Sequence, residues 1–305
     1  MSDPPPGIQR DYPLARLTTI RTGGRGELFA RPGSLEELER VLGWAAGEDI
    51  EVGVVGSGSN LLVADVGVRG LILKLDKELS EIELDGTRIY CGAGARLPSV
   101  AARAAQAGLE GLEFGVNIPG TVGGAVRMNA NAYGGELARV LEWVDVTTGS
   151  RTERHTPNQL GFGYRRSSLA TGQIVARVCF ALKASEVARV KATLADMRAR
   201  RRAAQPVGVK TFGSTFKNPD DPRAEGRTAG QLLDEAGCRG LRIGGAGFSE
   251  KHANFIVNHG DAATADVVAV MAEGRNRVRE RFGITLEPEV QTLGPVEIPA
   301  DWSPR

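Results

Sequence analysis

Residues 51–65 read EVGVVGSGSNLLVAD, so a hydrophobic run meets the glycine-rich segment 56–60 and a second hydrophobic run follows. This pattern is typical of the start of a glycine fingerprint that binds dinucleotides. A Rossmann fingerprint also needs a third glycine, and it opens a helix whose N-terminus holds the pyrophosphate. Here Leu61 occupies the third glycine position, and the residues after it predict another extended segment. The stretch therefore excludes a Rossmann turn.

Two interpretations of this loop are left. In the first, successive backbone N–H groups form a concave anion site between two extended segments, and Ser57, Ser59 and Asn60 add further donors. In the second, the segment is a tight glycine turn between strands. The loop by itself does not distinguish them.

A second glycine-rich block follows at residues 115–135, GVNIPGTVGGAVRMNANAYGG. A run so rich in Gly, Ala and Thr does not form a packed core, and it is typical of main chain that approaches a flat ring or a phosphate. Two such loops in the same half of the chain predict one extended cofactor between them. The alternative is a glycine-rich edge hairpin.

The composition is that of an ordinary globular protein. Of 305 residues, 41% are apolar and 25% charged, which favours about two domains with real cores. The 38 basic and 37 acidic residues give a net charge of +1, which predicts no general attraction to nucleic acid or membranes. The three cysteines form no CxxC pair and there are three histidines, so we expect neither a disulfide framework nor a metal site. The sequence has no signal peptide and no long apolar run, which favours a cytoplasmic protein.

Hydrophobic periodicity predicts alternating helices and strands. A capping box at Ser34 and Glu37 marks the start of the first helix. Hairpins are expected at Asp85-Gly86 and around Thr148-Gly149. The sequence character changes near residue 185. Helices are expected at 34–48, at 97–107 with a stop at Gly108, at about 185–204 as a strongly amphipathic helix, at 229–236 and at 265–281.

Seven motifs carry a family resemblance. In order they are GSGSNLLV (56–63), IPGTVGGA (118–125), GYRRSSL (163–169), GSTFKNP (213–219), AGQLLDEAG (229–237), KHANFIVN (251–258) and LEPEV (286–290). Together they resemble the UDP-N-acetylenolpyruvoylglucosamine reductases, the MurB family of peptidoglycan synthesis, over about residues 14–294.

The resemblance implies an α+β protein. Its expected parts are a two-subdomain FAD-binding module of the vanillyl-alcohol-oxidase type plus a C-terminal α/β substrate-binding domain. We therefore expect an N-terminal arm at 1–13, the FAD-binding module at 14–195 with a division near 70–80, and the C-terminal domain at 196–305.

By the same resemblance the two glycine loops bind FAD from between strands. The residues implied around the pyrophosphate are Gly56, Ser57, Gly58, Ser59, Asn60 and Leu61. Those implied along the flavin and at the remaining diphosphate contacts are Asn117, Ile118, Pro119, Gly120, Thr121, Gly123, Gly124 and Ala125. Asn117 stands where the family usually has glycine, and Asn131 interrupts the usual NAGAYG. Because Asn tolerates left-handed backbone, we expect the loop to keep its conformation.

The implied reaction is the reduction of UDP-N-acetylglucosamine enolpyruvate to UDP-N-acetylmuramate with NADPH and FAD. Ser214 matches the family's proton donor, Arg165 the residue that pairs with the substrate carboxylate, and Glu289 the carboxylate at the enolate. Arg166 and Glu287 are the competing neighbours. On an extended segment Arg166 would face away from Arg165.

Further residues are expected to hold the substrate. They are Tyr164, Arg202, Lys217, Asn218, Arg239 and His252. Alternatively, the basic run that contains Arg202 is a solvated helix face, and His252 is a packed histidine. Arg239 lies in GCRG, where the family more often has GLKG.

The short spacing between Arg165 and Ser214 predicts the shorter family form, which lacks an extra tyrosine loop over the substrate. We expect a cytoplasmic monomer that works in cell-wall biogenesis, and through it in cell shape, cell cycle and division. Nucleic acid and membranes are not expected partners.

Two other functions are compatible with parts of the pattern. One is a flavin-dependent oxidoreductase of the same fold that acts on another small substrate. The other is a nucleotide or nucleic-acid binder that uses the basic helix at 189–202. The balanced charge and the absence of interleaved aromatic residues disfavour the second alternative.

Overall fold

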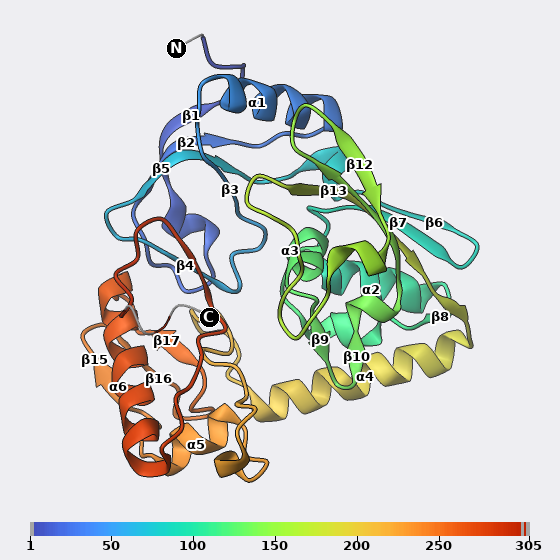
Figure 1. Cartoon of the computed structure of the whole chain (residues 1–305). Coiled ribbons are helices and arrows are strands. Elements are labelled where there is room, and N and C mark those ends of the chain that lie inside the picture. The colour runs from blue at the N-terminus through green and yellow to red at the C-terminus, as the bar shows by residue number, and fades with distance from the viewer. Residues whose placement is uncertain (1–2, 300–301, 303–305) are drawn as a thin grey trace. The chain divides into compact units, whose positions relative to one another are not determined.

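The structure is a computed structural model that describes residues 3–299 and 302. The chain folds into two compact units, each assembled from separate stretches of sequence (Figure 1). Unit 1 comprises the chain up to Asp11, Glu27–Ser57 and Gly70–Arg201, and unit 2 comprises Tyr12–Gly26, Gly58–Arg69 and the chain from Arg202 on. The first glycine loop is therefore divided, with Gly56 and Ser57 in unit 1 and the rest in unit 2.

The first sheet contains four strands and one covering helix. Its strands, in spatial order, are β1 (Gln9–Pro13), β2 (Arg25–Ala30), β5 (Val68–Leu73) and β3 (Val52–Val54), and the helix is α1 (Leu35–Gly47). β1 lies within the expected N-terminal arm and forms the edge strand. The predicted cap of α1 is confirmed, because Ser34 Oγ accepts a hydrogen bond of 3.2 Å from Glu37 N. Glu37 Oε2 accepts from Gly33 N instead of Ser34 N.

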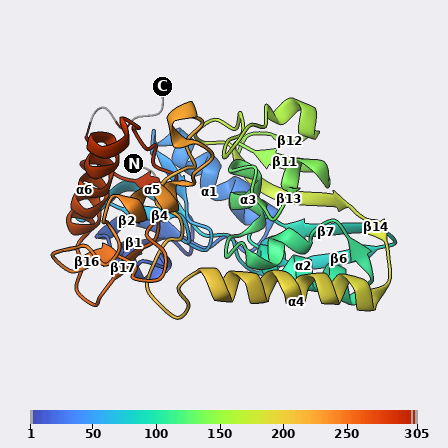
Figure 2. The same cartoon turned by 90° about the horizontal axis from the view of Figure 1, so that it is seen from below.

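The second sheet of unit 1 has five antiparallel strands. In spatial order they are β12 (Thr152–His155), β11 (Leu141–Thr147), β13 (Ile174–Ala181), β7 (Arg88–Gly92) and β6 (Ile82–Asp85). Both predicted hairpins are confirmed, with Gly86 and Gly149 in the left-handed region. Helices α2 (Leu97–Gln106) and α3 (Val122–Arg127) pack against β7, and α3 also packs against β13 (Figure 2).

Short pairs and one long helix complete this part of the chain. The pairs are β8 (Leu109–Glu110) with β14 (Lys183–Ala184), and β9 (Asn131–Ala132) with β10 (Gly135–Glu136). The long helix is α4 (Val187–Ala204), in which Val190 and Leu194 are the buried residues. A strongly amphipathic helix was predicted here, but the apolar face of α4 is narrow, because arginines and alanines occupy most of the remaining surface.

Unit 2 combines two small sheets with two helices. β4 (Leu61–Val63) pairs in parallel with β18 (Gln291–Leu293), and β15 (Arg242–Ile243), β16 (Ala246–Phe248) and β17 (Ile256–Asn258) form an antiparallel meander. Helix α5 (Ala229–Glu235) begins with a capping box of Thr228 and Gln231. Helix α6 (Thr264–Phe282) packs on the meander and ends at the left-handed Gly283 (Figure 1). Both predicted helices are confirmed.

Cys91, Cys179 and Cys238 are free thiols, and burial raises the pKa of each. Among the residues that the structure describes, no cluster of potential ligands could hold a metal ion, and no helix is long and apolar enough to cross a bilayer.

Candidate active site

Two glycines of the first loop are required by close contacts within the protein. In unit 1, a Cβ on Gly56 would lie 2.4 Å from Thr121 Oγ1. In unit 2, Gly58 has a φ of +61°, and a Cβ there would lie 2.0 Å from the Leu17 carbonyl oxygen. A larger residue would displace the Thr121 side chain at Gly56 and the backbone of Leu17 and Thr18 at Gly58. These contacts within the protein are sufficient to explain why both positions are glycine.

The second glycine block is held beside Gly56 in unit 1. Val122 N donates to Ala95 O and Gly123 N to Ala93 O, each over 2.8 Å. Thr121 caps α3 by accepting from Gly124 N. The two loops that were expected to share one cofactor therefore meet at Gly56 and Thr121. The edge-hairpin alternative describes only the small β9–β10 pair.

Two glycines in this block are explained neither by protein packing nor by a positive φ. The nearest atom to a Cβ on Gly120 is Ile118 Cγ2 at 3.9 Å, and for Gly124 it is Thr121 Oγ1 at 3.5 Å. Both distances are ordinary van der Waals contacts, so the fold itself has room for a side chain. Pro119 and Gly124 are exposed and Gly120 is half-buried. This bare strip of main chain fits a cofactor that approaches the backbone closely.

Asn117, the departure from the family's glycine, is a buried anchor. It ends the 3-10 helix η3 (Glu113–Asn117), and its Nδ2 donates a 2.7 Å hydrogen bond to Met197 O in α4. Its φ is not positive. The loop therefore keeps its conformation at this position without a left-handed backbone, and the tolerance of Asn for that conformation is not needed.

Arg165 lies at the tip of a tight turn, and the expectation of an extended segment is wrong. Gly163 N donates to Arg166 O over 3.1 Å, and Arg166 N donates back to Gly163 O over 3.2 Å. Arg165 has a φ of +57°, a conformation that costs a non-glycine residue about 1–2 kcal/mol. The different environments of Arg165 and Arg166 therefore come from this turn, and not from the alternation of side chains along a strand. The observed strain is a known feature of functional positions.

Two asparagines of the second glycine block hold this turn. Arg165 Nη1 donates to Asn131 O over 3.2 Å. Asn129 is buried, and its Nδ2 donates to Gly163 O over 3.2 Å and to Glu136 Oε1 over 2.6 Å. Sequence reasoning missed Asn129, because an asparagine in a glycine-rich run carries no distinctive local signal.

In unit 2, Ser214 and Glu289 lie on adjacent segments. Ser214 forms a bridge with Phe255, and Thr215 N donates to Asn254 O over 2.8 Å. On the other side, Glu289 N donates to Thr215 O over 2.8 Å. The Ser214 segment is thus held between the KHANFIVN and LEPEV motifs. Backbone pairing therefore holds the segments of two of the three predicted catalytic residues side by side.

Asn60 joins the first glycine loop to Glu289 within unit 2. Its Nδ2 donates to Glu289 O over 3.2 Å, and its own carbonyl accepts from Gln291 N over 3.1 Å. Asn60 was predicted to contact the cofactor. The structure uses its amide group to position the segment that carries Glu289.

Asn254 is a positioning residue that sequence reasoning missed. It is buried, and its side chain makes both possible bonds to the Phe216 backbone: Phe216 N donates to Oδ1 and Nδ2 donates to Phe216 O, each over 2.9 Å. The sequence does mark Asn254 as unusual, because an asparagine between Ala253 and Phe255 interrupts an apolar run. A buried polar residue of this kind needs partners.

The expected substrate residues next to Ser214 have fixed orientations. Lys217 Nζ lies 3.3 Å from Glu287 Oε2, so the neighbour of Glu289 is engaged in an exposed ion pair. Asn218 Oδ1 accepts from Ala229 N over 3.1 Å at the start of α5. This bond directs the Asn218 amide nitrogen away from the helix.

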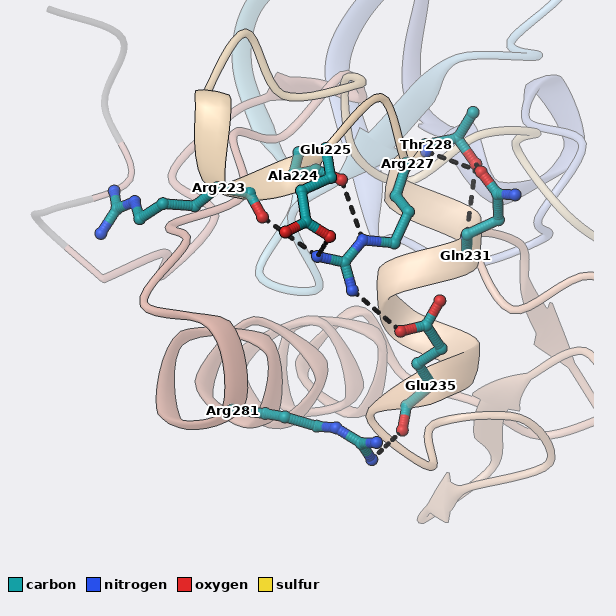
Figure 3. A network of polar contacts seen from close by, with 8 residues as sticks. All are labelled: Arg223, Ala224, Glu225, Arg227, Thr228, Gln231, Glu235 and Arg281. Carbon is teal, nitrogen blue, oxygen red and sulfur yellow. Dashed lines mark hydrogen bonds and ion pairs between the residues drawn. The ribbon is translucent and has the colours of Figure 1, made fainter.

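The loop after Asn218 is fixed by a polar network (Figure 3). Arg227 Nε donates to Ala224 O over 2.8 Å, and its Nη1 donates to Glu235 Oε2 over 3.0 Å. Arg281 of α6 donates to Glu235 O. The loop is therefore tied to α5, and α5 is tied in turn to α6.

Arg239 and His252 are already engaged with the protein. Arg239 Nε donates to Asp234 Oδ1 over 2.6 Å, which lowers the pKa of that carboxyl, and its Nη1 donates to Glu250 O. Burial, with help from Arg239, lowers the pKa of His252. His252 Nδ1 accepts from Asn254 N over 3.2 Å, and its ring lies 4.8 Å from that of Phe255.

The remaining substrate candidates are exposed. Tyr164 is at the tip of the Arg165 turn, with the Arg165 guanidinium carbon 5.4 Å from its ring centre. The side chain of Arg202 is exposed, and its carbonyl accepts from Lys251 Nζ over 2.7 Å.

Two family models match the chain. The FAD binding domain model matches residues 27–156, and the model for the UDP-N-acetylenolpyruvoylglucosamine reductase C-terminal domain matches residues 205–293. This order confirms the predicted FAD-binding module followed by a C-terminal domain.

Individual proteins are similar over nearly the whole length. UDP-N-acetylenolpyruvoylglucosamine reductase 2 of Symbiobacterium thermophilum is 44% identical over 292 residues, which cover 95% of this chain and 93% of that protein. The Acidiphilium cryptum reductase is 43% identical over 93% of this chain and 90% of its own length. The crystal structure of the Thermus caldophilus reductase (MurB) matches with a TM-score of 0.81 and 38% identity, covering 94% of this chain and 98% of that one.

Proposed function

The chain belongs to the UDP-N-acetylenolpyruvoylglucosamine reductase (MurB) family, a family of flavoprotein oxidoreductases, and we propose that it reduces UDP-N-acetylglucosamine enolpyruvate to UDP-N-acetylmuramate with NADPH. One observation in the molecule carries this assignment. The segments of Ser214 and Glu289 are joined by the 2.8 Å hydrogen bond from Glu289 N to Thr215 O.

Gly120 and Gly124 are the residues best suited to hold FAD, because the protein leaves the space beside them open. FAD held there would supply the hydride chemistry, with NADPH as the source of the hydride and the terminal vinyl carbon of the substrate as its acceptor. The open main chain excludes side chains from that surface and admits a flat ring.

The chain's own residues would then complete the reduction. The planar guanidinium of Arg165 pairs with the substrate carboxylate, into which electron density moves as hydride arrives. Ser214 Oγ delivers the proton to the other vinyl carbon, and Glu289 acts at the same enolate. One hydride and one proton add across the double bond, so the enolpyruvyl ether becomes a lactyl ether. Lys217 and Asn218 hold the substrate next to Ser214.

Arg202, Arg239, Tyr164 and His252 are retained as proposed substrate contacts. For Arg239, a diphosphate would compete with Asp234, because the two side chains are already paired. We further propose a monomer of the shorter family form, acting in the cytoplasm in peptidoglycan precursor synthesis. Measurement of the molar mass in solution by light scattering tests the monomer.

An absorbance experiment tests the function. The purified protein is expected to bind FAD, lose its flavin absorbance on anaerobic addition of NADPH, and recover it on addition of the enolpyruvyl sugar nucleotide. Failure to bind FAD would exclude a flavoenzyme. Recovery with other small substrates but not with the sugar nucleotide would favour a different oxidoreductase of the same fold.

A variant tests the proton donor. Ser214→Ala is expected to leave flavin reduction by NADPH intact and to slow the second half-reaction by at least about 100-fold, which is typical for loss of a general acid. Ser150→Ala, an exposed serine in a hairpin, is the matched control. Equal loss of both half-reactions would rule out Ser214 as the proton donor.

A further inference from the structure

We infer that Lys74 binds the pyrophosphate of the FAD, at a cationic cluster that it forms with Arg31 and Arg96 beside Gly56. This inference rests on the proposed function, since it requires that the chain hold a dinucleotide. It adds a cationic side chain to a phosphate site that the motif explained by backbone N–H groups and by Ser57, Ser59 and Asn60.

Lys74 is placed at the loop by the sheet of unit 1. It directly follows β5, and Lys74 N donates to Ala30 O over 3.0 Å, while Val55 N donates to Leu73 O over 2.8 Å. These bonds bring the end of β5 alongside the start of the glycine loop. Lys74 Nζ then donates to Gly56 O over 2.5 Å. An ammonium has three N–H bonds, so this contact leaves two for other acceptors.

The charge around Lys74 calls for an anion. Lys74 is half-buried, and its burial, the Arg31 charge and the Arg96 charge all lower its pKa, opposed by Asp76. Asp76 Oδ1 accepts from Lys77 N, so this carboxylate is also engaged in capping a 3-10 helix. Arg31 and Arg96 therefore add positive charge around the Lys74 ammonium. A phosphate would offset both the burial and the repulsion.

Lys74 also stands out in the sequence. It interrupts the buried run Leu71–Leu75, in which every other residue is apolar and buried. A lysine in such a run is costly unless its ammonium has a partner. The alternative is a purely structural role, in which Lys74 only holds the loop through its hydrogen bond to Gly56 O. The experiment must distinguish this role from phosphate binding.

The experiment compares flavins with and without the pyrophosphate. Flavin is removed from wild type, Lys74→Met and Lys74→Arg, and FAD, FMN and riboflavin are titrated by fluorescence. Lys74→Met keeps the apolar stem and removes the charge. We expect it to weaken FAD binding by about 10- to 100-fold, the range for a lost charge-assisted hydrogen bond, and to leave riboflavin binding within about twofold. Lys74→Arg should restore most of the FAD affinity. Lys191→Met, an exposed lysine of α4, is the matched control.

A second measurement does not depend on weak flavin analogues. The Tm of each flavin-free variant reports the fold, and the rise in Tm with added FAD reports binding. We expect an unchanged flavin-free Tm for Lys74→Met and a smaller rise with FAD.

Three outcomes overturn the inference. Equal losses for FAD and riboflavin, or a lowered flavin-free Tm, would make Lys74 a structural clip. Unchanged FAD affinity with a raised KM for NADPH would assign the cluster to the nicotinamide cofactor's phosphates. Unchanged values throughout would exclude any role in phosphate binding. If wild type itself binds no FAD, the proposed function fails before this inference is reached.

Discussion

Asn254→Ala tests how the proton donor is positioned. The substitution removes the two 2.9 Å hydrogen bonds that fix the Phe216 backbone, two residues after Ser214. Leaving the buried N–H and C=O of Phe216 without partners costs about 1–3 kcal/mol for each group. For the two groups together, we expect the free energy of unfolding to fall by about 2–6 kcal/mol.

The assay separates positioning from folding. At a temperature well below the Tm of the variant, reduction of the flavin by NADPH should continue at the wild-type rate, because unit 1 is unchanged. Transfer to the enolpyruvyl substrate should lose kcat with little change in KM, because Ser214 is displaced from the reacting carbon. Asn254→Asp keeps an acceptor for Phe216 N and loses the donor to Phe216 O, so we expect an intermediate effect.

Asn158→Ala, an exposed asparagine, is the control. Equal slowing of both half-reactions would mean that Asn254 supports the fold in general. An unchanged Tm would contradict the energetic estimate.

Three further predictions concern glycines and charges. Gly56→Ala is expected to destabilise the protein by about 1–3 kcal/mol through overpacking, whereas Gly120→Ala should leave the flavin-free Tm unchanged and weaken FAD binding. A lowered Tm for Gly120→Ala, together with an unchanged Tm for Gly56→Ala, would contradict the assignment of Gly56 to packing and of Gly120 to the cofactor. FAD affinity should be constant at low pH and fall as pH rises through the lowered pKa of Lys74, because a bound phosphate raises that pKa. A Lys74→Arg variant should keep its FAD affinity over the same pH range. If wild type and Lys74→Arg show the same pH profile, the ammonium of Lys74 does not bind the phosphate. The hydrogen bond from Arg88 lowers the pKa of Glu142, so it stabilises the protein at pH values above the pKa that Glu142 has in the unfolded chain. This stabilisation is lost as pH falls through the lower pKa of Glu142 in the folded protein. Arg88→Met should reduce the difference in Tm between pH 7 and pH 3, and no change would show that the exposed pair does not contribute to stability.

Local determinants made the helices and hairpins predictable. Ser34 caps α1 through Glu37, three residues away, and Gly86 and Gly149 turn their hairpins with positive φ. In each case the residues that decide the conformation are neighbours in the sequence. Propensity and pattern are therefore enough to place the element.

The turn of Arg165 was not predictable in this way. Its neighbours GYRRSS are compatible with an extended segment, and the observed turn depends on Asn129 and Asn131, more than thirty residues earlier. Contacts of this kind have no local pattern.

The sequence by itself determined the family, the order of the FAD-binding and C-terminal parts, and the identity of the candidate residues, because ordered motifs record chemistry residue by residue. Only the tertiary structure decided which glycines the fold requires and which leave main chain open, and only it brought Asn60, Thr215 and Glu289 into one hydrogen-bonded array. The physical reason is that both questions depend on the atoms that oppose each residue in space, and those atoms belong to segments far away along the chain.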